Sequence, residues 1–486
     1  SPNIPGDTSF HLPPLGAVID TIKGTILTAS GSENPRGYRI CPLYPGDVKY
    51  GISLPTVITH RRYPVIPKST DTVIVRAVVR RTSGGFAINR GVLLFSVNNG
   101  PWTVDSMSMI SADSTYEGRI LDPDGNPFPA NTNIRYFVKG LDIGGNQQIL
   151  ASSSFAFEND TSKGFFFYQV LDRPLTIHDV QYTPYPNGRT PFLGGVTTVG
   201  GIVTASGSEI NVTPLNNAGT SAWYIQDGTS PWNGIWVVKD TVNHPQLDSV
   251  KLGDSVAVTG TIQEQFDVTR IFDSVVTIKA HNRPLPAPVT ITTGTFGLRG
   301  NGDLVAEPYE GMLIKVVNAS VTNITPVFSD STEYEINDGS GPMLVRRDGI
   351  NTYGNRESDT LTTGASRILH NGDKVDTIVG VGWFAFSRYY IEPRRNNDIV
   401  AGDLYPYDNN WNIVSLGLKQ LPASTGYRVD SLYPGKASPA FAYNGSYALS
   451  PSLTIGPGYW IRFNGARNIA RLGLKATLDT IPITAG

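Results

Sequence analysis

The stretch GDSVAVTGTIQEQFDVTRI (Gly253–Ile271) decides how the middle of this sequence is organised. Apolar and polar residues alternate along much of it, which is the period-two pattern of a half-buried β-strand. A second stretch, GDKVDTIVGVGWFAFSRYYIEPRR (Gly372–Arg395), repeats the order. A similar motif precedes each copy: YIQDGTSPW (Tyr224–Trp232) before the first and YEINDGSGP (Tyr334–Pro342) before the second. The sequence therefore predicts two tandem domains with the same β architecture.

The composition indicates the same fold class for the whole chain. Gly (51) and Pro (35) are abundant, whereas Met (4) and His (6) are scarce. Gly and Pro set turns, and β-branched and aromatic residues suit pleated surfaces. A chain of 486 residues is also too long for one ordinary core. We therefore expect an all-β protein built from tandem β-sandwich and OB-like barrel domains.

The charge and hydropathy patterns exclude two classes of partner. With 39 basic and 41 acidic residues the net charge is -2, so no global field attracts nucleic acid or an anionic membrane surface. No apolar run reaches the roughly 18 residues that a membrane-spanning helix needs. We expect neither a nucleic-acid partner nor membrane insertion.

Turns, repeats and composition divide the chain into six segments. A stretch rich in Pro and Tyr, RPLTIHDVQYTPYPNGRTPFLGG (Arg173–Gly195), indicates a linker before the first barrel. The predicted segments are 1–54 (closing half of an OB-like β domain, incomplete), 55–158 (sandwich), 159–190 (linker), 191–283 (OB-like barrel), 284–402 (second OB-like barrel) and 403–486 (small C-terminal β module, incomplete at its end).

Three parts of the chain resemble known modules. The segment with LLFSVNNGPW (Leu93–Trp102) and NIRYFVKGLDIGGN (Asn133–Asn146) resembles the immunoglobulin-like or fibronectin type III-like modules of bacterial surface proteins. The two repeated units resemble OB-like barrels found beside secreted nucleases. WNIVSL (Trp411–Leu416) and GPGYWIRF (Gly456–Phe463) resemble a β module of type IX secretion cargo. These resemblances imply an extracellular, cell-surface location.

The start of the chain matches the end of the second barrel rather than its beginning. AVIDTIKGTILTASG (Ala17–Gly31) and GYRICPLYPGDVKYG (Gly37–Gly51) follow the residue order of KVDTIVGVGWFAF (Lys374–Phe386) and YYIEPRRNNDIVAG (Tyr389–Gly402). We predict that this start forms the last strands of a barrel whose first strands are absent, and that a neighbouring subunit completes it. LGLKATLDTIPITAG (Leu472–Gly486) likewise resembles a module cut short.

The sequence offers no catalytic residue. It contains no HExxH, GxSxG, Walker A or CxxC motif, and its histidines are scattered over different predicted domains. The best metal candidate is DPDGN, where Asp122, Asp124 and Asn126 could hold calcium, although the same residues suit an ordinary hairpin turn. We expect no cofactor. The lone Cys41 excludes an internal disulfide and is expected to be buried as a small apolar residue.

Aromatic residues near arginines give the best candidates for ligand binding. OB folds use exposed aromatic rings as stacking platforms beside a basic groove. Alternation along a strand, however, turns about half of such rings into the barrel core, so packing within and between domains is the alternative role. The candidates are Trp232 and Trp236 in the first barrel, and Trp383, Arg388, Tyr390 and Arg394 in the second.

Three functions remain open at this point. The first is a non-enzymatic structural or adhesive protein that polymerises into a surface fibre, sheath or filament, with surface glycans as possible ligands. The second is a polysaccharide- or nucleic-acid-binding accessory region of a secreted hydrolase whose catalytic domain lies elsewhere. An enzyme in its own right is the third, and no residue supports it.

Overall fold

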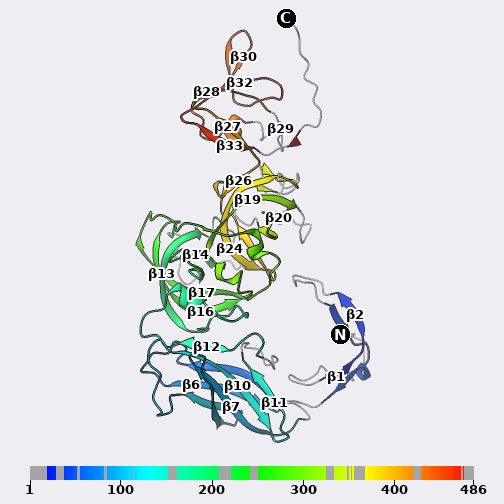
Figure 1. The fold of residues 1–486 in the computed structure, drawn as a ribbon, viewed down its shortest axis with the longest axis vertical. Coiled ribbons are helices and arrows are strands. Elements are labelled where there is room, and N and C mark those ends of the chain that lie inside the picture. The colour runs from blue at the N-terminus through cyan, green and yellow to red at the C-terminus, as the bar shows by residue number, and fades with distance from the viewer. Residues whose placement is uncertain are drawn as a thin grey trace.

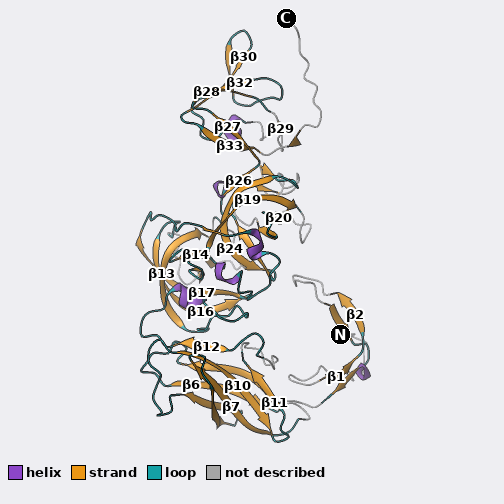
Figure 2. Ribbon diagram, in the orientation of Figure 1, coloured by secondary structure: helices purple, strands orange, loops and turns teal. Residues whose placement is uncertain are grey.

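The computed structural model describes residues 19–28, 38–51, 55–81, 85–112, 114–151, 161–206, 209, 220–240, 250–324, 333–346, 350–351, 353–354, 367–416, 418–419, 428–471 and 474–475. Nearly all regular structure in these ranges is β-strand, which confirms the predicted all-β class (Figure 2). The α-helices are short: α1 (Ile177–Gln181), α2 (Thr293–Phe296) and α5 (Val429–Leu432). None of the described helices has the length and apolar character needed to cross a bilayer.

The N-terminal unit consists of two antiparallel ribbons, β1 with β4 and β2 with β3. It lies to one side of the other domains, at the blue end of the chain (Figure 1). Its elements are β1 (Ile19–Ile22), β2 (Thr25–Thr28), β3 (Tyr38–Cys41), the 3₁₀ helix η1 (Pro45–Asp47) and β4 (Val48–Tyr50).

A β-sandwich follows. Its strands are β5 (Thr56–Tyr63), β6 (Val73–Arg80), β7 (Ile88–Val97), β8 (Trp102–Ser111), β9 (Thr115–Ile120), β10 (Asn133–Asp142), β11 (Gln147–Leu150) and β12 (Phe166–Gln169). β8 joins the two layers, because its first half pairs with β7 and its second half with β9. The layers approach closely at Gly140, where a Cβ would lie 2.7 Å from Cγ1 of Val79 in β6.

Within the predicted linker 159–190, the described residues 161–190 pack on both neighbouring domains, which corrects the division made from the sequence. β12 pairs with β10 and so belongs to the sandwich. α1 packs on the first barrel, where Gln181 Nε2 donates to the Gly234 carbonyl at 2.8 Å. The Pro- and Tyr-rich composition therefore belongs to a segment that is packed on both neighbouring domains.

The first barrel is closed by five strands in the order β13-β14-β15-β17-β16, with β13 pairing again with β16. The β15–β17 pair is parallel and the other pairs are antiparallel. This arrangement agrees with the OB-like barrel predicted from the sequence. The strands are β13 (Val196–Ser206), β14 (Thr220–Gln226), β15 (Gly234–Asp240), β16 (Ser255–Gln265) and β17 (Val268–Ala280).

The second barrel repeats this order as β19-β20-β21-β25-β24 and is closed by the β19–β24 pair. Among these five strands one pair, β21–β25, is again parallel, and the short β18 adds a second parallel pairing with β19. Its elements are β18 (Val289–Thr290), η3 (Glu307–Tyr309), β19 (Leu313–Asn323), β20 (Glu333–Asn337), β21 (Pro342–Arg346), β22 (Tyr353–Gly354), β23 (Arg367–Ile368), β24 (Lys374–Ala385), β25 (Arg388–Glu392), η4 (Asn396–Asp398) and β26 (Ile399–Ala401).

A short helix packs on each barrel, and an aspartate at the same position of each repeat holds its first turn. Asp227 Oδ2 accepts from the Ile177 N–H at 3.3 Å. Asp338 accepts from the Thr293 N–H at 3.1 Å and from its hydroxyl at 2.6 Å. The helix that each aspartate holds lies about 45 to 50 residues earlier in the chain, so these contacts do not follow from a local sequence pattern.

The C-terminal module has a separate small core that includes Val414, Tyr433 and Phe463. Its strands are β27 (Asp403–Tyr407), β28 (Asn410–Val414), β29 (Leu418–Lys419), β30 (Ala440–Tyr443), β31 (Tyr447–Ser450), β32 (Tyr459–Phe463), β33 (Arg467–Arg471) and β34 (Leu474–Lys475). The other two cores cross domain borders, one joining the sandwich to the first barrel and one joining the two barrels. The domains therefore form a row that ends in the C-terminal module (Figure 1).

Candidate functional site

The N-terminal unit pairs its strands as the closing half of the second barrel does. In that barrel, β24 pairs with β26 through its first part and with β25 through its second part. In the N-terminal unit, β1 and β2 take the place of β24. β1 pairs with β4, and β2 pairs with β3. The matching cross-strand pairs are Ile22–Val48 with Ile378–Ile399, and Thr25–Cys41 with Val381–Glu392. We call the described residues 19–28 and 38–51 the N-terminal half-barrel.

The connection between the ribbons is also the same in both regions. Asp47 Oδ2 accepts from the backbone N–H groups of Leu43 (3.1 Å) and Tyr44 (2.9 Å). Asp398 Oδ2 accepts from the N–H groups four and three residues before it, at 2.9 and 3.3 Å. Each aspartate ends a 3₁₀ turn, η1 or η4, that leads into the last strand.

A glycine marks the close approach of the backbones in each region. A Cβ on Gly380 would lie 2.6 Å from the carbonyl carbon and oxygen of Glu392. A Cβ on Gly24 would overlap the carbonyl of Cys41, which pairs at the equivalent position. The glycine in the shared Asp-Thr-Ile-x-Gly pattern is therefore explained by this contact.

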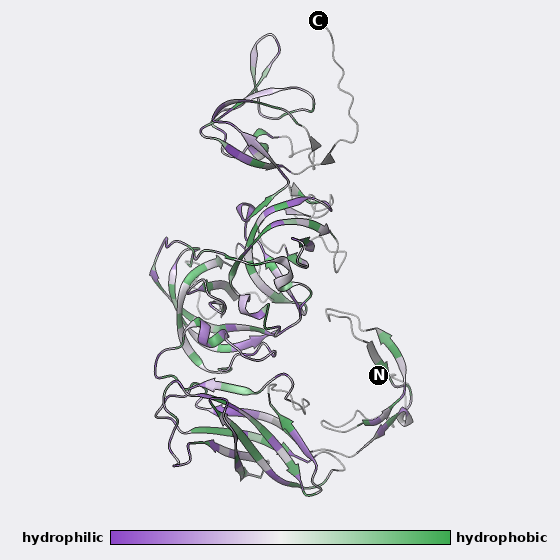
Figure 3. Ribbon diagram, in the orientation of Figure 1, coloured by the Kyte–Doolittle hydropathy of each residue, from purple (hydrophilic) through white to green (hydrophobic). Residues whose placement is uncertain are grey.

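The two regions differ in what covers them. In the second barrel Val375, Ile378 and Ile391 are 1%, 0% and 0% exposed, because β19 to β21 complete the barrel over them. Their counterparts in the N-terminal half-barrel are Ile19, Ile22 and Ile40, which are 39%, 38% and 47% exposed. None of the side chains described in the half-barrel is buried. Figure 3 shows the apolar character of β2 in this open ribbon.

Cys41 differs from the sequence-based expectation for the same reason. It was expected to be buried, but it is only half-buried. Glu392, the residue at the equivalent position of the second barrel, is completely buried. Within the part of the chain that the structure describes, no strands equivalent to β19 to β21 lie over Cys41.

A second exposed apolar surface lies on the C-terminal module. Its four-stranded sheet has the order β28-β32-β30-β31, so β28 and β31 are edge strands among the described residues. We call the exposed large side chains of this sheet the C-terminal apolar face: Trp411, Ile413, Tyr443, Tyr447 and Leu449. Contiguous exposed apolar surface of this kind marks an interaction site in many soluble proteins.

The structure buries half of the aromatic and basic candidates. Trp236 and Tyr390 are both buried, Trp236 in the core that joins the two barrels, which corrects their selection as ligand-stacking residues. Arg394 is also buried: it pairs with Asp398 at 2.8 Å and donates to the Thr204 carbonyl of the first barrel at 2.6 Å. These three side chains therefore take part in packing within and between the barrels, the alternative role that the sequence left open.

The remaining candidates are partly exposed but lie in separate places. Trp232 meets Tyr182 edge to face at 5.7 Å, at the junction of the sandwich with the first barrel. Trp383 lies 5.8 Å from Tyr390 on the second barrel, with Arg388 at the start of β25. The barrels therefore do not form one shared stacking platform from these residues.

The metal candidate forms a turn. Asp122 Oδ1 accepts from the N–H groups of Asp124 (3.0 Å) and Asn126 (2.7 Å), so this oxygen is occupied by the backbone. The described residues contain no group of three or more His, Cys, Asp or Glu side chains arranged to hold a metal ion. The turn interpretation of DPDGN therefore fits the geometry.

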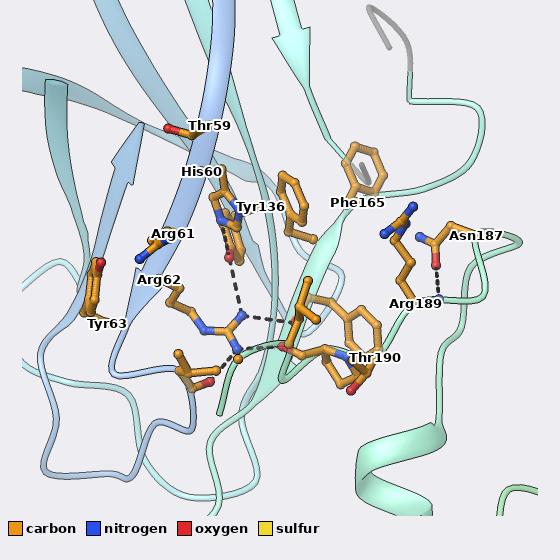
Figure 4. Close-up of a pocket in the computed structure, with 16 residues that line it drawn as sticks. Thr59, His60, Arg61, Arg62, Tyr63, Tyr136, Phe165, Asn187, Arg189 and Thr190 are labelled. Atoms are coloured by element: carbon orange, nitrogen blue, oxygen red, sulfur yellow. Dashed lines mark hydrogen bonds between the residues drawn. The ribbon is translucent and has the colours of Figure 1, made fainter. Parts of the chain in front are cut away.

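A pocket of about 570 Å³ opens between the sandwich and the segment leading to the first barrel (Figure 4). Arg62 is buried in its wall and donates to the carbonyls of Val65 (2.5 Å) and Pro191 (2.7 Å), among other acceptors. Its guanidinium therefore ties the sandwich to residues that precede the first barrel. His60 stacks on Phe166 and hydrogen bonds to the Tyr136 hydroxyl at 2.7 Å. Burial, with the nearby charge of Arg62, lowers the pKa of His60 to about 3, so it is neutral at physiological pH.

Buried carboxyl groups gather where the two barrels meet. Thr269 bridges two of them, donating its hydroxyl to Glu264 at 3.0 Å and its N–H to Glu310 at 3.3 Å. Burial raises the pKa of Glu264 to about 8 and that of Glu307 to about 7. Burial also raises the pKa of Glu310 well above its usual range, and the charges of Glu307 and Glu264 add to the effect.

Comparison with known proteins adds little to this geometry. No protein-family model and no curated protein matches the chain. A murine DNA-binding protein solved with double-stranded DNA is 13% identical, with a TM-score of 0.21 over 40% of this chain and 90% of its own. The Ifi202 HINa domain, solved with 20-bp DNA, is 11% identical, with a TM-score of 0.20 over 41% of this chain and 94% of its own. The uncharacterized Listeria monocytogenes protein lmo2446, solved with glucose, magnesium and calcium, is 8% identical, with a TM-score of 0.17 over 84% of this chain and 28% of its own. Similarities at these TM-scores carry no argument about function.

Proposed function

We propose that this chain is a non-enzymatic, extracellular structural subunit whose N-terminal half-barrel is covered by a neighbouring copy. The observation that carries the proposal is the exposure of Ile19, Ile22 and Ile40, at positions that the same fold buries in the second barrel. Exposed strand edges with apolar side chains associate readily by adding strands from another chain. A neighbour that covered these side chains would bury them as β19 to β21 bury their counterparts.

The surface that fits best on a neighbouring copy is the C-terminal apolar face. In the described part of the chain its edge strands have no further pairing, and its aromatic and aliphatic side chains are exposed, whereas the sandwich and the two barrels share continuous buried cores. The half-barrel and this face are different surfaces of one chain, so their contact would be heterologous. Heterologous contacts that do not close into a ring produce open-ended filaments. The resemblance of WNIVSL and GPGYWIRF to a module of exported surface proteins favours assembly outside the cell.

The test is the assembly state of the full chain. We expect the wild-type protein to form concentration-dependent polymers in sedimentation velocity and filaments in electron micrographs. The Ile22→Asp/Ile40→Asp variant should remain monomeric, because charges at these positions prevent apolar contact. Ile110→Asp is the matched control, since Ile110 is a 48% exposed isoleucine on strand β8 of the sandwich. A wild-type chain that stays monomeric at every concentration, or a double variant that assembles as well as Ile110→Asp, contradicts the proposal.

The alternative of a ligand-binding accessory region has one supporting observation of its own. Two adjoining pockets lie at the junction of the sandwich with the first barrel, and domain junctions are common places for ligand sites. This junction could serve an adhesive subunit equally well.

A further inference from the structure

A second pocket, of about 510 Å³, lies beside the pocket of Figure 4. Its walls come from β10 and β12 of the sandwich, from α1 and from the chain that follows α1. The two pockets share Phe167 and Pro191, so they adjoin along the junction. Together they offer room for several linked units of a chain-like ligand rather than for one small molecule.

Aromatic rings form one side of the second pocket. Phe167 meets Tyr182 at 6.5 Å and 90°, and meets Tyr185 at 5.8 Å and 77°. His178 stacks on Tyr182 at 5.2 Å and 12°. The rings hold one another in fixed orientations, yet Tyr182 remains 40% exposed. Rigid, partly exposed aromatic side chains provide apolar contact area together with a polar hydroxyl group.

Three polar side chains of this pocket are amides whose hydrogen-bonding groups no other described residue uses. The side chains of Asn99, Asn133 and Gln169 line it and make no hydrogen bond to the rest of the chain that the structure describes. Each amide has both donors and an acceptor. A ligand rich in hydroxyl groups, which also donate and accept, matches this set.

The charged side chains of the pocket are already engaged. Arg135 lies over the rings of Trp102 (5.0 Å) and Phe165 (5.5 Å). Asp179 pairs with Arg173 at 2.5 Å and caps the first turn of α1. Recognition of a polyphosphate backbone needs basic groups that are free to contact it. The second pocket therefore favours an uncharged ligand over nucleic acid, whereas Arg61 and Arg189 line the adjoining pocket, so the test includes a nucleic-acid probe.

We propose that the junction of the sandwich and the first barrel binds a neutral glycan chain, with sugar rings against Phe167, Tyr182 and Tyr185 and sugar hydroxyls on the amides of Asn99, Asn133 and Gln169. The sequence analysis selected Trp232, which packs against Tyr182, but missed the other rings. Those rings lie on a segment interpreted as a linker. This site is independent of the half-barrel and of the assembly that it supports.

The test is isothermal titration calorimetry of the full chain with cellohexaose, mannohexaose and xylohexaose. Single-stranded dT20 serves as the nucleic-acid probe. We expect at least one hexasaccharide to bind, and Tyr182→Ala to weaken that binding about tenfold or more, as loss of one stacking ring does. Asn133→Ala should also weaken it, and this exposed residue can be replaced without loss of buried packing. Tyr443→Ala is the control, because Tyr443 is 63% exposed on the C-terminal module, and it should bind as the wild type does.

Three results would overturn the proposal. The first is the absence of binding by all three hexasaccharides at millimolar concentration. The second is binding that Tyr182→Ala and Asn133→Ala leave unchanged. The third is binding of dT20 that the same two variants abolish, since this would make the junction a site for nucleic acid. None of these results depends on whether the chain polymerises.

Discussion

The N-terminal half-barrel and the closing half of the second barrel show how much of a β domain is local. Both have the same cross-strand pairs, the same aspartate-capped 3₁₀ turn and the same glycine beside a carbonyl. Among the described residues, only the second has a core, because there β19 to β21 lie over the apolar side chains. Strand pairing and turns thus follow from a short stretch of sequence, whereas burial requires strands from elsewhere.

The largest expected effect comes from placing a charge at one matched position of each region. Ile378→Asp should destabilise the second barrel by about 4 kcal/mol, because it buries an unpaired carboxylate in a packed core. Ile22→Asp should change the unfolding free energy of the dispersed chain by no more than about 0.5 kcal/mol, as exposed substitutions usually do. Urea unfolding followed by tryptophan fluorescence measures both effects.

Equal destabilisation by the two substitutions would contradict this comparison. It would mean that the half-barrel is covered within a single chain, so that Ile22 is buried in solution. Ile110→Asp again provides the matched exposed control, and it should resemble Ile22→Asp in the dispersed protein.

A smaller effect should come from pH, at the contact between the barrels. The raised pKa values of Glu264 and Glu307 mean that the native protein keeps protons that the unfolded chain, with glutamate pKa values near 4.3, releases earlier. The unfolding free energy should therefore fall as pH rises from about 4.5 to about 8 and then level off. Urea midpoints measured at pH 5, 7 and 9 test this.

Two variants separate the buried carboxyl groups from general pH effects. Glu310→Gln removes one of them and should flatten the pH dependence between pH 5 and 9. Glu335→Gln is the control in the same barrel, because this carboxylate accepts from the Thr322 hydroxyl in an exposed position. The account is wrong here if stability rises with pH over this range, or if both variants behave alike.

The sequence predicted those parts of the fold that short patterns determine. The alternation of apolar and polar residues, together with the repeated motif before each copy, indicated both barrels. The Asp-Thr-Ile-x-Gly pattern related the start of the chain to the end of the second barrel. The burial of Arg394 was not predictable, since its partner carbonyl belongs to Thr204, about 190 residues earlier. Its place in the contact between the barrels depends on how whole domains pack.

The candidate ligand residues were harder to predict than the fold. Aromatic clustering identified Trp236 and Tyr390, but a strand pattern does not show which face of a barrel a neighbouring domain covers. The rings of the junction pocket were missed because Phe167 and Tyr182 lie in a Pro- and Tyr-rich segment. That segment resembles a linker until β12 is seen to pair with β10.

Cys41 provides the most direct measurement of the central claim, that a neighbouring copy covers the half-barrel. It is the only cysteine in the sequence and lies half-buried on β3, so its alkylation rate reports on this surface in the unmodified protein. We predict that iodoacetamide modifies Cys41 about tenfold more slowly, or slower still, in the assembled wild-type protein than in the monomeric Ile22→Asp/Ile40→Asp variant, because thiol reactivity follows access. Equal rates in the assembled and dispersed proteins would contradict the account.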